Sequence, residues 1–249
     1  MAGIFVAGTD TGVGKTTVSV ALLHWLRSQG WSVVAMKPVA SGCQESEAGL
    51  RNADALALQQ AAGAPLEYRQ VNPYAYREPV SPYLAARIAG RPVNIPFIAE
   101  TYRNLADRAD WVVVESVGGW HCPLTERETA ADLALRLGLP VLLVVGLRLG
   151  CISHALLTER AIAADGLHCL GWVGNQPQPE YALAEPNLTD LGRRLRAPAV
   201  GHFPFVQPHS GGGGEGGGFA AELLLEILRR LSRSVTLRPF ECADKPTHR

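Results

Sequence analysis

A glycine-rich loop between an expected strand and an expected helix constrains the fold of this 249-residue chain more than any other feature. The loop, residues 8–17, follows a short apolar run at residues 4–7 and leads into a segment with helical periodicity at residues 15–29. Glycines let consecutive backbone N–H groups point inward, and the helix N-terminus adds partial positive charge. Lys15 can reach the outer phosphates of a nucleotide, and the Thr16 hydroxyl can ligate Mg²⁺. The loop therefore predicts a nucleotide phosphate site rather than a chance glycine-rich turn.

The spacing of this loop departs from the general G-x-x-x-x-G-K-[ST] pattern. That pattern places glycine at position 9, where this chain has Thr9, and the nearest glycine upstream is Gly8. The loop is therefore a variant of the general phosphate-binding pattern, and this variant reduces the number of protein families that fit the chain. Protein kinases are excluded, because their glycine-rich loop does not carry a lysine such as Lys15.

Segments with strand and helix character alternate along the chain, which predicts a parallel sheet with helices on both faces and right-handed crossovers. A turn-rich, irregular stretch is expected at residues 66–82. Strands are expected at residues 4–7, 32–36, 111–114, 141–145, 169–173 and 199–203. Helices are expected at residues 15–29, from near Asp54 to Gly63, after an N-cap at Ser81, and at residues 95–108, 130–137 and 153–164.

The glycine-rich stretch at residues 211–218 divides the expected domain organisation. We expect one domain over residues 1–210, a linker or loop over 211–218, and a C-terminal helix of the same domain over 219–231. Residues 232–249 are expected to form a flexible tail.

Charge balance excludes some classes of protein. Lys and Arg number 23, as do Asp and Glu, so the formal net charge of +0 argues against a nucleic-acid-binding surface. No apolar run approaches the ~20 residues of a membrane span, and the N-terminus does not resemble a signal peptide. The 5 cysteines are scattered without a C-x-x-C pair, which favours free thiols in a reducing cytoplasm.

Four further residues are candidates for chemistry beside this loop. Glu115 directly follows an apolar strand, where a buried carboxylate is costly without a cation, and this favours a metal ligand over a solvent-facing glutamate. Asp54 is equally consistent with a metal ligand and with a helix N-terminal aspartate. Lys37 could stabilise transition-state charge beside a triphosphate, although a surface lysine is the more common explanation. The Ser41 hydroxyl, in the same loop, could orient a substrate group.

Several segments, taken together and in this order, closely resemble the dethiobiotin synthetase family. They are residues 8–16, 37–42, 51–56, 71–73, 115–120, 150–152 and 171–175, and the resemblance covers roughly residues 1 to 206. It implies a P-loop NTPase fold, a three-layer α/β/α sandwich with a mainly parallel central sheet. It also implies a cytoplasmic homodimer that converts 7,8-diaminononanoate, CO2 and ATP to dethiobiotin, ADP and phosphate. The implied intermediates are an N-carbamate and a carbamic–phosphoric mixed anhydride.

The resemblance also implies roles for individual residues. The catalytic residues would be Lys37, Lys15, Thr11 and Ser41, and Mg²⁺ would be held by Thr16, Asp54 and Glu115. ATP would contact Gly12, Val13, Gly14, Lys15, Thr16, Thr17, Asp54, Glu115, Ser116, Val117, Gly118, Asn175, Gln176, Pro204, Phe205 and Val206, with Asn175 at the adenine edge. The substrate would contact Ser41, Gly150, Cys151 and Ser153, the last three across the homodimer interface.

The chain departs from the family's pattern at several places. Gly12 stands where the family often has Glu, Ser116 where Gly is usual, and Ser153 where Asn is common. A glutamate usually completes the base pocket shortly after Pro204, and whether Glu215 does so here is open, as is the choice among ATP, CTP and GTP.

Three other classes of protein compete with this interpretation. Partitioning-type and septum-positioning ATPases share the broad fold, but they usually carry a lysine early in the loop, where this chain has Asp10, and they lack the segment at residues 37–42. A cobyrinate-type amidotransferase would need a glutaminase domain, for which 249 residues leave no room. A nucleotide-binding module without catalysis is the third alternative.

Overall fold

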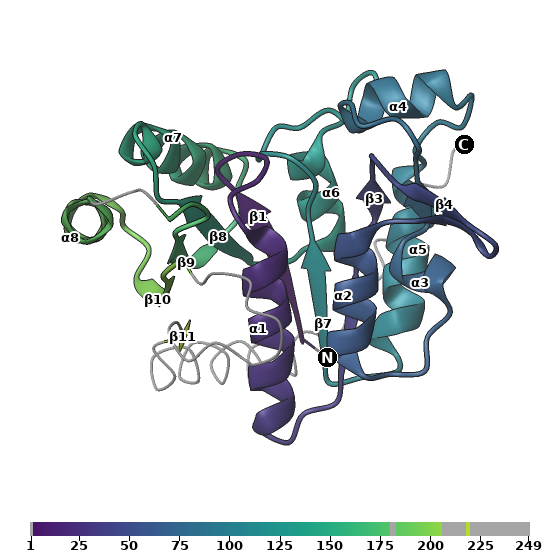
Figure 1. Cartoon of the computed structure of the whole chain (residues 1–249), viewed down its shortest axis with the longest axis horizontal. Helices are drawn as coiled ribbons and strands as arrows, with labels where there is room; N and C mark the ends of the chain where they lie inside the picture. Colours follow the sequence, from purple (N-terminus) through teal and green to yellow (C-terminus); the bar gives the residue numbers. More distant parts are fainter. Residues whose placement is uncertain (1, 180–182, 206–217, 220–249) are drawn as a thin grey trace, which may run out of the picture.

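The computed structural model describes residues 2–179, 183–205 and 218–219 (Figure 1). Val206, Glu215 and the tail at residues 232–249 lie outside the described residues, as do most of the expected linker and C-terminal helix. Gly218 and Phe219 are described, and they form the short strand β11 (Gly218–Phe219) rather than the end of a linker and the start of a helix.

A 7-stranded sheet forms the centre of the described chain, with the order β11-β10-β9-β8-β1-β7-β2. All neighbouring strands are parallel except β10 and β11, which are antiparallel. The strands are β1 (Ala2–Gly8), β2 (Val33–Met36), β7 (Trp111–Glu115), β8 (Val141–Gly146), β9 (Cys169–Asn175) and β10 (Ala199–Phe203). The parallel sheet predicted from the alternation of elements is confirmed.

Helices cover both faces of this sheet, because successive side chains of a strand point to opposite faces. Ile4 and Val6 of β1 pack in one apolar cluster with α1 (Lys15–Ser28) and α2 (Ala53–Ala62). Phe5 and Ala7 pack in a second cluster with α5 (Ile95–Ala106), α6 (Ala130–Leu137), α7 (Cys151–Ala164) and α8 (Ala184–Arg194). The result is the expected three-layer α/β/α sandwich.

Small elements extend one end of the sandwich. Figure 1 shows α7 and α8 beside β8 to β10 on the left, and α4 (Pro82–Ile88), α3 (Tyr68–Val71) and α5 on the right. Two short two-stranded sheets lie on the right as well. They pair β3 (Val39–Ala40) with β6 (Tyr74–Ala75), and β4 (Gln44–Ser46) with β5 (Gly49–Arg51).

The expected elements over residues 4–203 are confirmed within a few residues at each end, and the differences lie in short or atypical elements. The irregular structure expected for residues 66–82 is wrong in part, because α3 and β6 lie there. The hairpin β4–β5 and helix α8 were not expected. Helix α8 contains a proline and a glycine, and the burial of Leu191 against the core holds it in place instead of helix propensity.

No helix in the described part of the chain is both long enough and apolar enough to cross a lipid bilayer.

Candidate active site

The strand order brings the predicted site residues to one edge of the sheet. Strand β7 lies between β1 and β2, and all three run in the same direction. Their carboxyl ends therefore meet, and each is followed by a predicted site segment. The glycine-rich loop follows β1, Glu115 ends β7, and Lys37 follows β2.

The glycine-rich loop leaves the N-terminus of α1 open to an anion. Gly12 and Gly14 have φ values of 70° and 89°, the left-handed region in which only glycine is unstrained. Gly14 is the N-cap of α1 and has no side chain that could cap the first turn, which leaves the backbone N–H groups there for phosphate. Asn175 closes the loop from the other side, because its Nδ2 donates to the Val13 carbonyl at 2.9 Å.

Lys15 is buried at the base of this loop and is held by two carbonyl groups. Its Nζ donates to the Asp10 carbonyl at 2.9 Å and to the Gly118 carbonyl at 2.7 Å. Burial, and next the positive charge of Lys37, lower the pKa of Lys15 to about 8. Because Gly118 lies in the loop after β7, Lys15 joins the two loops on either side of the phosphate site.

Lys37, Asp54, Glu115 and Thr16 form a compact polar cluster beside the loop. The Nζ of Lys37 donates to Asp54 Oδ2 at 2.8 Å and to Glu115 Oε1 at 2.5 Å, and Thr16 Oγ1 donates to the same Glu115 oxygen at 2.9 Å. Glu115 is fully buried and Lys37 is only 4% exposed, whereas about half of the Asp54 side chain is exposed. The interpretation of Lys37 as a surface lysine is therefore wrong.

The charges within the cluster stabilise one another. Burial alone would lower the pKa of Lys37, but Glu115 and Asp54 outweigh it and raise the pKa above its usual value. Burial alone would raise the pKa of Asp54, but the ammonium group of Lys37 outweighs it and lowers the pKa. Lys37 is therefore protonated and Asp54 ionised across the neutral pH range.

The donor atoms of the cluster suit a magnesium ion. One hydroxyl and two carboxylates, from Thr16, Asp54 and Glu115, are hard oxygen donors of the kind that Mg²⁺ prefers, and phosphates and water usually supply the other ligands. Glu115 Oε2 is buried and has no hydrogen-bond partner among the described residues, so it is a free acceptor at this place. The described part of the chain contains no group of three or more His, Cys, Asp or Glu that could hold a metal by itself.

Two charged residues that sequence reasoning did not assign to the site organise the loop. Asp10 Oδ1 accepts from the Thr11 backbone N–H at 2.7 Å, and Asp10 Oδ2 pairs with Arg148 Nη2. Arg148 lies two residues before Gly150, at which the predicted substrate segment begins. The position of Asp10 within the glycine-rich loop was the only sequence signal for this link, because 138 residues separate it from its partner.

The loop after β7 is anchored to the end of α7 by an aspartate that the sequence did not single out. Trp120 Nε1 donates to Asp165 Oδ2 at 2.7 Å, and His121 Nε2 lies 3.0 Å from the same oxygen. The Trp120 ring packs edge-on against Phe5, with ring centroids 6.3 Å apart. This anchors the segment that contains Gly118, a partner of Lys15.

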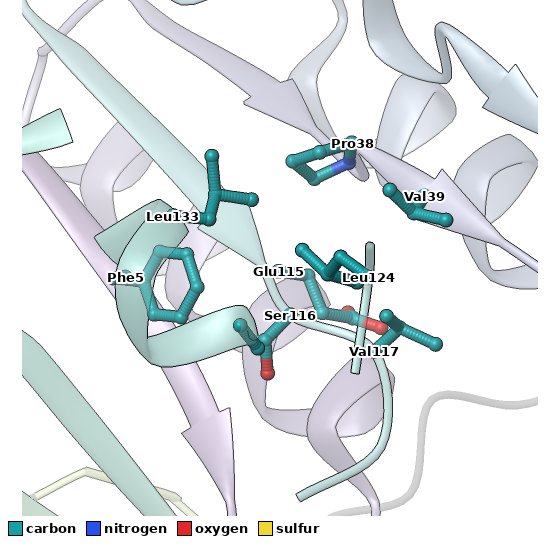
Figure 2. A pocket seen from close by; sticks show the side chains of 9 residues that line it. Phe5, Pro38, Val39, Glu115, Ser116, Val117, Leu124 and Leu133 are labelled. Atoms are coloured by element: carbon teal, nitrogen blue, oxygen red, sulfur yellow. The ribbon is translucent and has the colours of Figure 1, made fainter. Parts of the chain in front are cut away.

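Ser116 and Val117, which follow Glu115, line a small pocket together with Pro38 and Val39 (Figure 2). The Ser116 hydroxyl is buried there and has no hydrogen-bond partner among the described residues. Ser41 lies half-buried just beyond β3. Thr17 is exposed in the first turn of α1.

The predicted base residues lie at or just after the ends of β9 and β10, and the predicted substrate residues other than Ser41 follow β8. Asn175 and Phe203 are register partners at the ends of β9 and β10, which places Gln176 beside Pro204 and Phe205. The Gln176 N–H donates to the Phe203 carbonyl at 2.8 Å.

Gly150 and Ser153 are exposed at the start of α7, where the substrate segment was predicted. Cys151 is buried, and its thiol contacts Asn187 Oδ1 at 3.7 Å. Gly150 and Ser153, rather than Cys151, therefore form the exposed face of this segment.

Comparisons with known proteins give a consistent result. The family model described as an AAA domain matches residues 2–211. The ATP-dependent dethiobiotin synthetase BioD of Pseudomonas paraeruginosa is 51% identical over 205 residues, which cover 82% of this chain and 90% of that protein. The protein of the same name from Xanthomonas oryzae is 50% identical over 201 residues, which cover 81% of this chain and 90% of that protein.

Solved structures show likeness of fold at much lower sequence identity. The MinC:MinD cell division complex of Aquifex aeolicus has a TM-score of 0.54 and 14% identity, covering 99% of this chain and 100% of that one. The septum site-determining protein MinD of Pyrococcus horikoshii, complexed with Mg-ADP, has a TM-score of 0.52 and 18% identity. The match covers 82% of this chain and 81% of that one. At these identities the likeness concerns the P-loop NTPase fold alone.

Proposed function

The chain belongs to the ATP-dependent dethiobiotin synthetase family, and we propose that the polar cluster at the ends of β1, β7 and β2 carries out the family's reaction. The reaction is the ATP-dependent carboxylation and ring closure of 7,8-diaminononanoate with CO2. The observation that supports this most directly is the buried pair of Lys37 and Glu115 beside an open phosphate loop. A partitioning-type regulatory ATPase would also have a phosphate-binding loop. The relative that is 51% identical to this chain, however, is a dethiobiotin synthetase.

ATP would bind with its phosphates at the N-terminus of α1 and its base toward the ends of β9 and β10. The free N–H groups after Gly14 and the partial positive charge of the helix favour phosphate there. Lys15, which is now held by carbonyl groups, would turn its ammonium group to the outer phosphates. Asn175, Pro204 and Phe205 would contact the base.

Mg²⁺ would be held by Thr16, Asp54 and Glu115 together with the nucleotide phosphates. When bound, the ion supplies positive charge that neutralises the phosphate oxygens and orients the γ-phosphate. The buried Glu115 Oε2 supports this assignment, because it is an acceptor without a partner among the described residues. The three residues also lie around one point, since Lys37 contacts both carboxylates and Thr16 contacts Glu115.

The chemistry requires positioning and charge stabilisation more than covalent participation by the protein. One amine captures CO2 as a carbamate, and the carbamate oxygen attacks the γ-phosphate to give a carbamic–phosphoric mixed anhydride and ADP. The second amine then closes the ureido ring and expels phosphate. Lys37 and Lys15 would stabilise the negative charge of the carbamate and the transferred group, and Thr11 and Ser41 would orient the substrate.

A homodimer would complete each active site with the start of α7 from the partner subunit. Leu149 is 92% exposed and Leu157 is 61% exposed, on the same segment as Gly150 and Ser153. Two largely exposed leucines, Leu149 just before α7 and Leu157 on it, favour a protein contact there. The cytoplasmic location expected from the sequence stays a prediction.

ADP release measured with and without 7,8-diaminononanoate and bicarbonate tests the proposed function. We expect release to require both compounds, to stop when EDTA removes Mg²⁺, and to yield one dethiobiotin per ADP by mass spectrometry. ATP hydrolysis that does not depend on the diamine would favour the regulatory ATPase and overturn the proposal. Absence of any hydrolysis, with ATP still bound, would favour a nucleotide-binding module.

A further inference from the structure

Residues 71–73 lie next to Lys37, and the proposed function assigns them no role. Asn72 is 3% exposed, and its side-chain amide makes two short contacts. Its Nδ2 donates to the Lys37 carbonyl at 2.6 Å, and its Oδ1 accepts from the Tyr68 hydroxyl at 2.9 Å. Its side chain thus reaches the main chain of Lys37 directly.

The Tyr68 hydroxyl extends this contact to the helix that carries Asp54. It accepts from the Asn52 backbone N–H at 2.8 Å. Asn52 is the N-cap of α2, and its side chain accepts from the Ala55 N–H at 3.2 Å, so Asp54 lies in the turn that Asn52 holds. A continuous chain of hydrogen bonds therefore joins the first turn of α2 to the peptide of Lys37.

Lys37 needs such support because of its place in the sheet. Among the described strands, β2 lies at the edge of the sheet and pairs only with β7, so no described strand flanks its outer side. Residues 71 and 72 take that place, since the Lys37 N–H donates to the Val71 carbonyl at 2.8 Å and the Lys37 carbonyl accepts from Asn72. Both backbone polar groups of Lys37 are bonded to this segment.

We propose that Tyr68 and Asn72 are positioning residues that set the distance between Lys37 and Asp54. The inference rests on the proposed function, in which Lys37 stabilises reacting charge and Asp54 holds Mg²⁺. Lys37 directly follows β2, whereas Asp54 lies in the first turn of α2, and their side chains meet at 2.8 Å. Removal of the bridging hydroxyl lets the start of α2 move relative to β2, which misplaces one partner with respect to the other.

The chain provides a closely matched control in Tyr74. Its hydroxyl accepts from the Asn94 N–H at 3.1 Å, and Asn94 is the N-cap of α5, a helix with no proposed site residue. An arginine also lies over each ring, Arg51 over Tyr68 at 4.2 Å and Arg91 over Tyr74 at 5.0 Å. The Tyr74 carbonyl, which Asn72 Nδ2 also contacts at 3.3 Å, is unaffected by a side-chain substitution.

The first test compares the steady-state kinetics of Tyr68→Phe and Tyr74→Phe. We expect the kcat of Tyr68→Phe to fall about tenfold, with KM for ATP changed less than about twofold, because one hydrogen bond and its alignment are lost. Tyr74→Phe should keep the parent's kcat, although its loss of thermal stability should be similar to that of Tyr68→Phe. Equal kcat values for the two variants would overturn the proposal.

The second test does not depend on activity. Amide hydrogen exchange of the protein without nucleotide or metal, followed residue by residue by NMR, should show the Asn52 amide exchanging about tenfold faster in Tyr68→Phe, because its acceptor is gone. In Asn72→Ala we expect faster exchange at Lys37. Unchanged exchange at both amides would overturn the proposal even where the kcat had fallen.

The two tests also separate this inference from the proposed function. If the parent protein shows no diamine-dependent ADP release, the proposed function fails, whereas the exchange rates still decide whether the bridge holds the two segments together. If the parent is active and Tyr68→Phe matches Tyr74→Phe in kcat, only the inference fails.

Discussion

At the scale of single residues, Lys37 carries the electrostatics of the site. Its ammonium group lies between two carboxylates, and one of them, Glu115, is fully buried. A buried charge without a partner is strongly destabilising, so Lys37 both stabilises the resting protein and lies ready to contact reacting charge. A substitution of Lys37 lets the effect on stability and the effect on catalysis be measured separately.

Substitution Lys37→Ala should lower kcat about 100-fold while the Kd for ATP changes only a few-fold, because the charge acts mainly in the transition state. The free energy of unfolding without Mg²⁺ should also fall, by about 3 kcal/mol, since Glu115 loses its partner. Single-turnover kinetics, ATP titration calorimetry and urea unfolding measure these quantities.

Lys37→Arg is the control for the charge, and it should keep most of the stability while it lowers turnover through altered geometry. Losses of equal size in kcat and in ATP affinity for Lys37→Ala would contradict a transition-state role.

At the scale of elements, α7 supports two parts of the site from its two ends. Its start carries the predicted substrate segment, and its C-cap residue, Asp165, holds Trp120 and His121 of the loop after β7. Burial alone would raise the pKa of Asp165, but the hydrogen bonds from His121 and Trp120 outweigh it and lower the pKa. This anchor therefore depends on an ionised carboxylate.

Asp165→Asn should lower the free energy of unfolding by about 1 kcal/mol at pH 7. Because the pKa of Asp165 is lower in the folded protein, its contribution is present above the unfolded value of about 4 and is lost as the pH falls through the folded value. The difference between parent and variant should therefore shrink below about pH 4. Urea unfolding over a pH series measures it.

Asp107→Asn is the matched control, because Asp107 is also a helix C-cap, on α5, and its carboxylate forms no ion pair with the described residues. We expect the free energy of unfolding of Asp107→Asn to stay close to that of the parent at every pH. A constant deficit for Asp165→Asn down to pH 2 would refute the role of the ionised carboxylate.

At the scale of the whole molecule, the proposed homodimer would complete each active site with a second subunit. The exposed leucines on and before α7 lie next to the segment that would reach the partner's substrate. Each subunit would then contribute its phosphate loop to one site and its α7 to the other.

Substitution Leu149→Asp should shift the protein from dimer to monomer and weaken the dimer at least about tenfold, because a charge replaces an apolar contact. Light scattering after size-exclusion chromatography, over a dilution series, measures the shift. Leu56→Asp is the control, since Leu56 is exposed on α2, which covers the other face of the sheet. A parent protein that is monomeric at all concentrations would contradict the homodimer.

Sequence reasoning succeeded where the signal is local. The apolar run before Glu115 predicted its strand and its place at the strand end, and the glycine pattern predicted the loop before Lys15. It left Asp54 open between two roles, because a helix N-terminal aspartate looks the same in both. It missed α8 and the bridge of Tyr68 and Asn72, which depend on packing and on partners distant in the sequence.

The sequence by itself determined the loop and the chemical groups at the strand ends, because glycine conformation and the apolar periods of strands and helices act over a few residues. Only the tertiary structure decided that β7 lies between β1 and β2, and with it that Thr16, Lys37 and Glu115 meet. Their charges act on one another because the parallel strand order buries them side by side, in a medium where water screens them little.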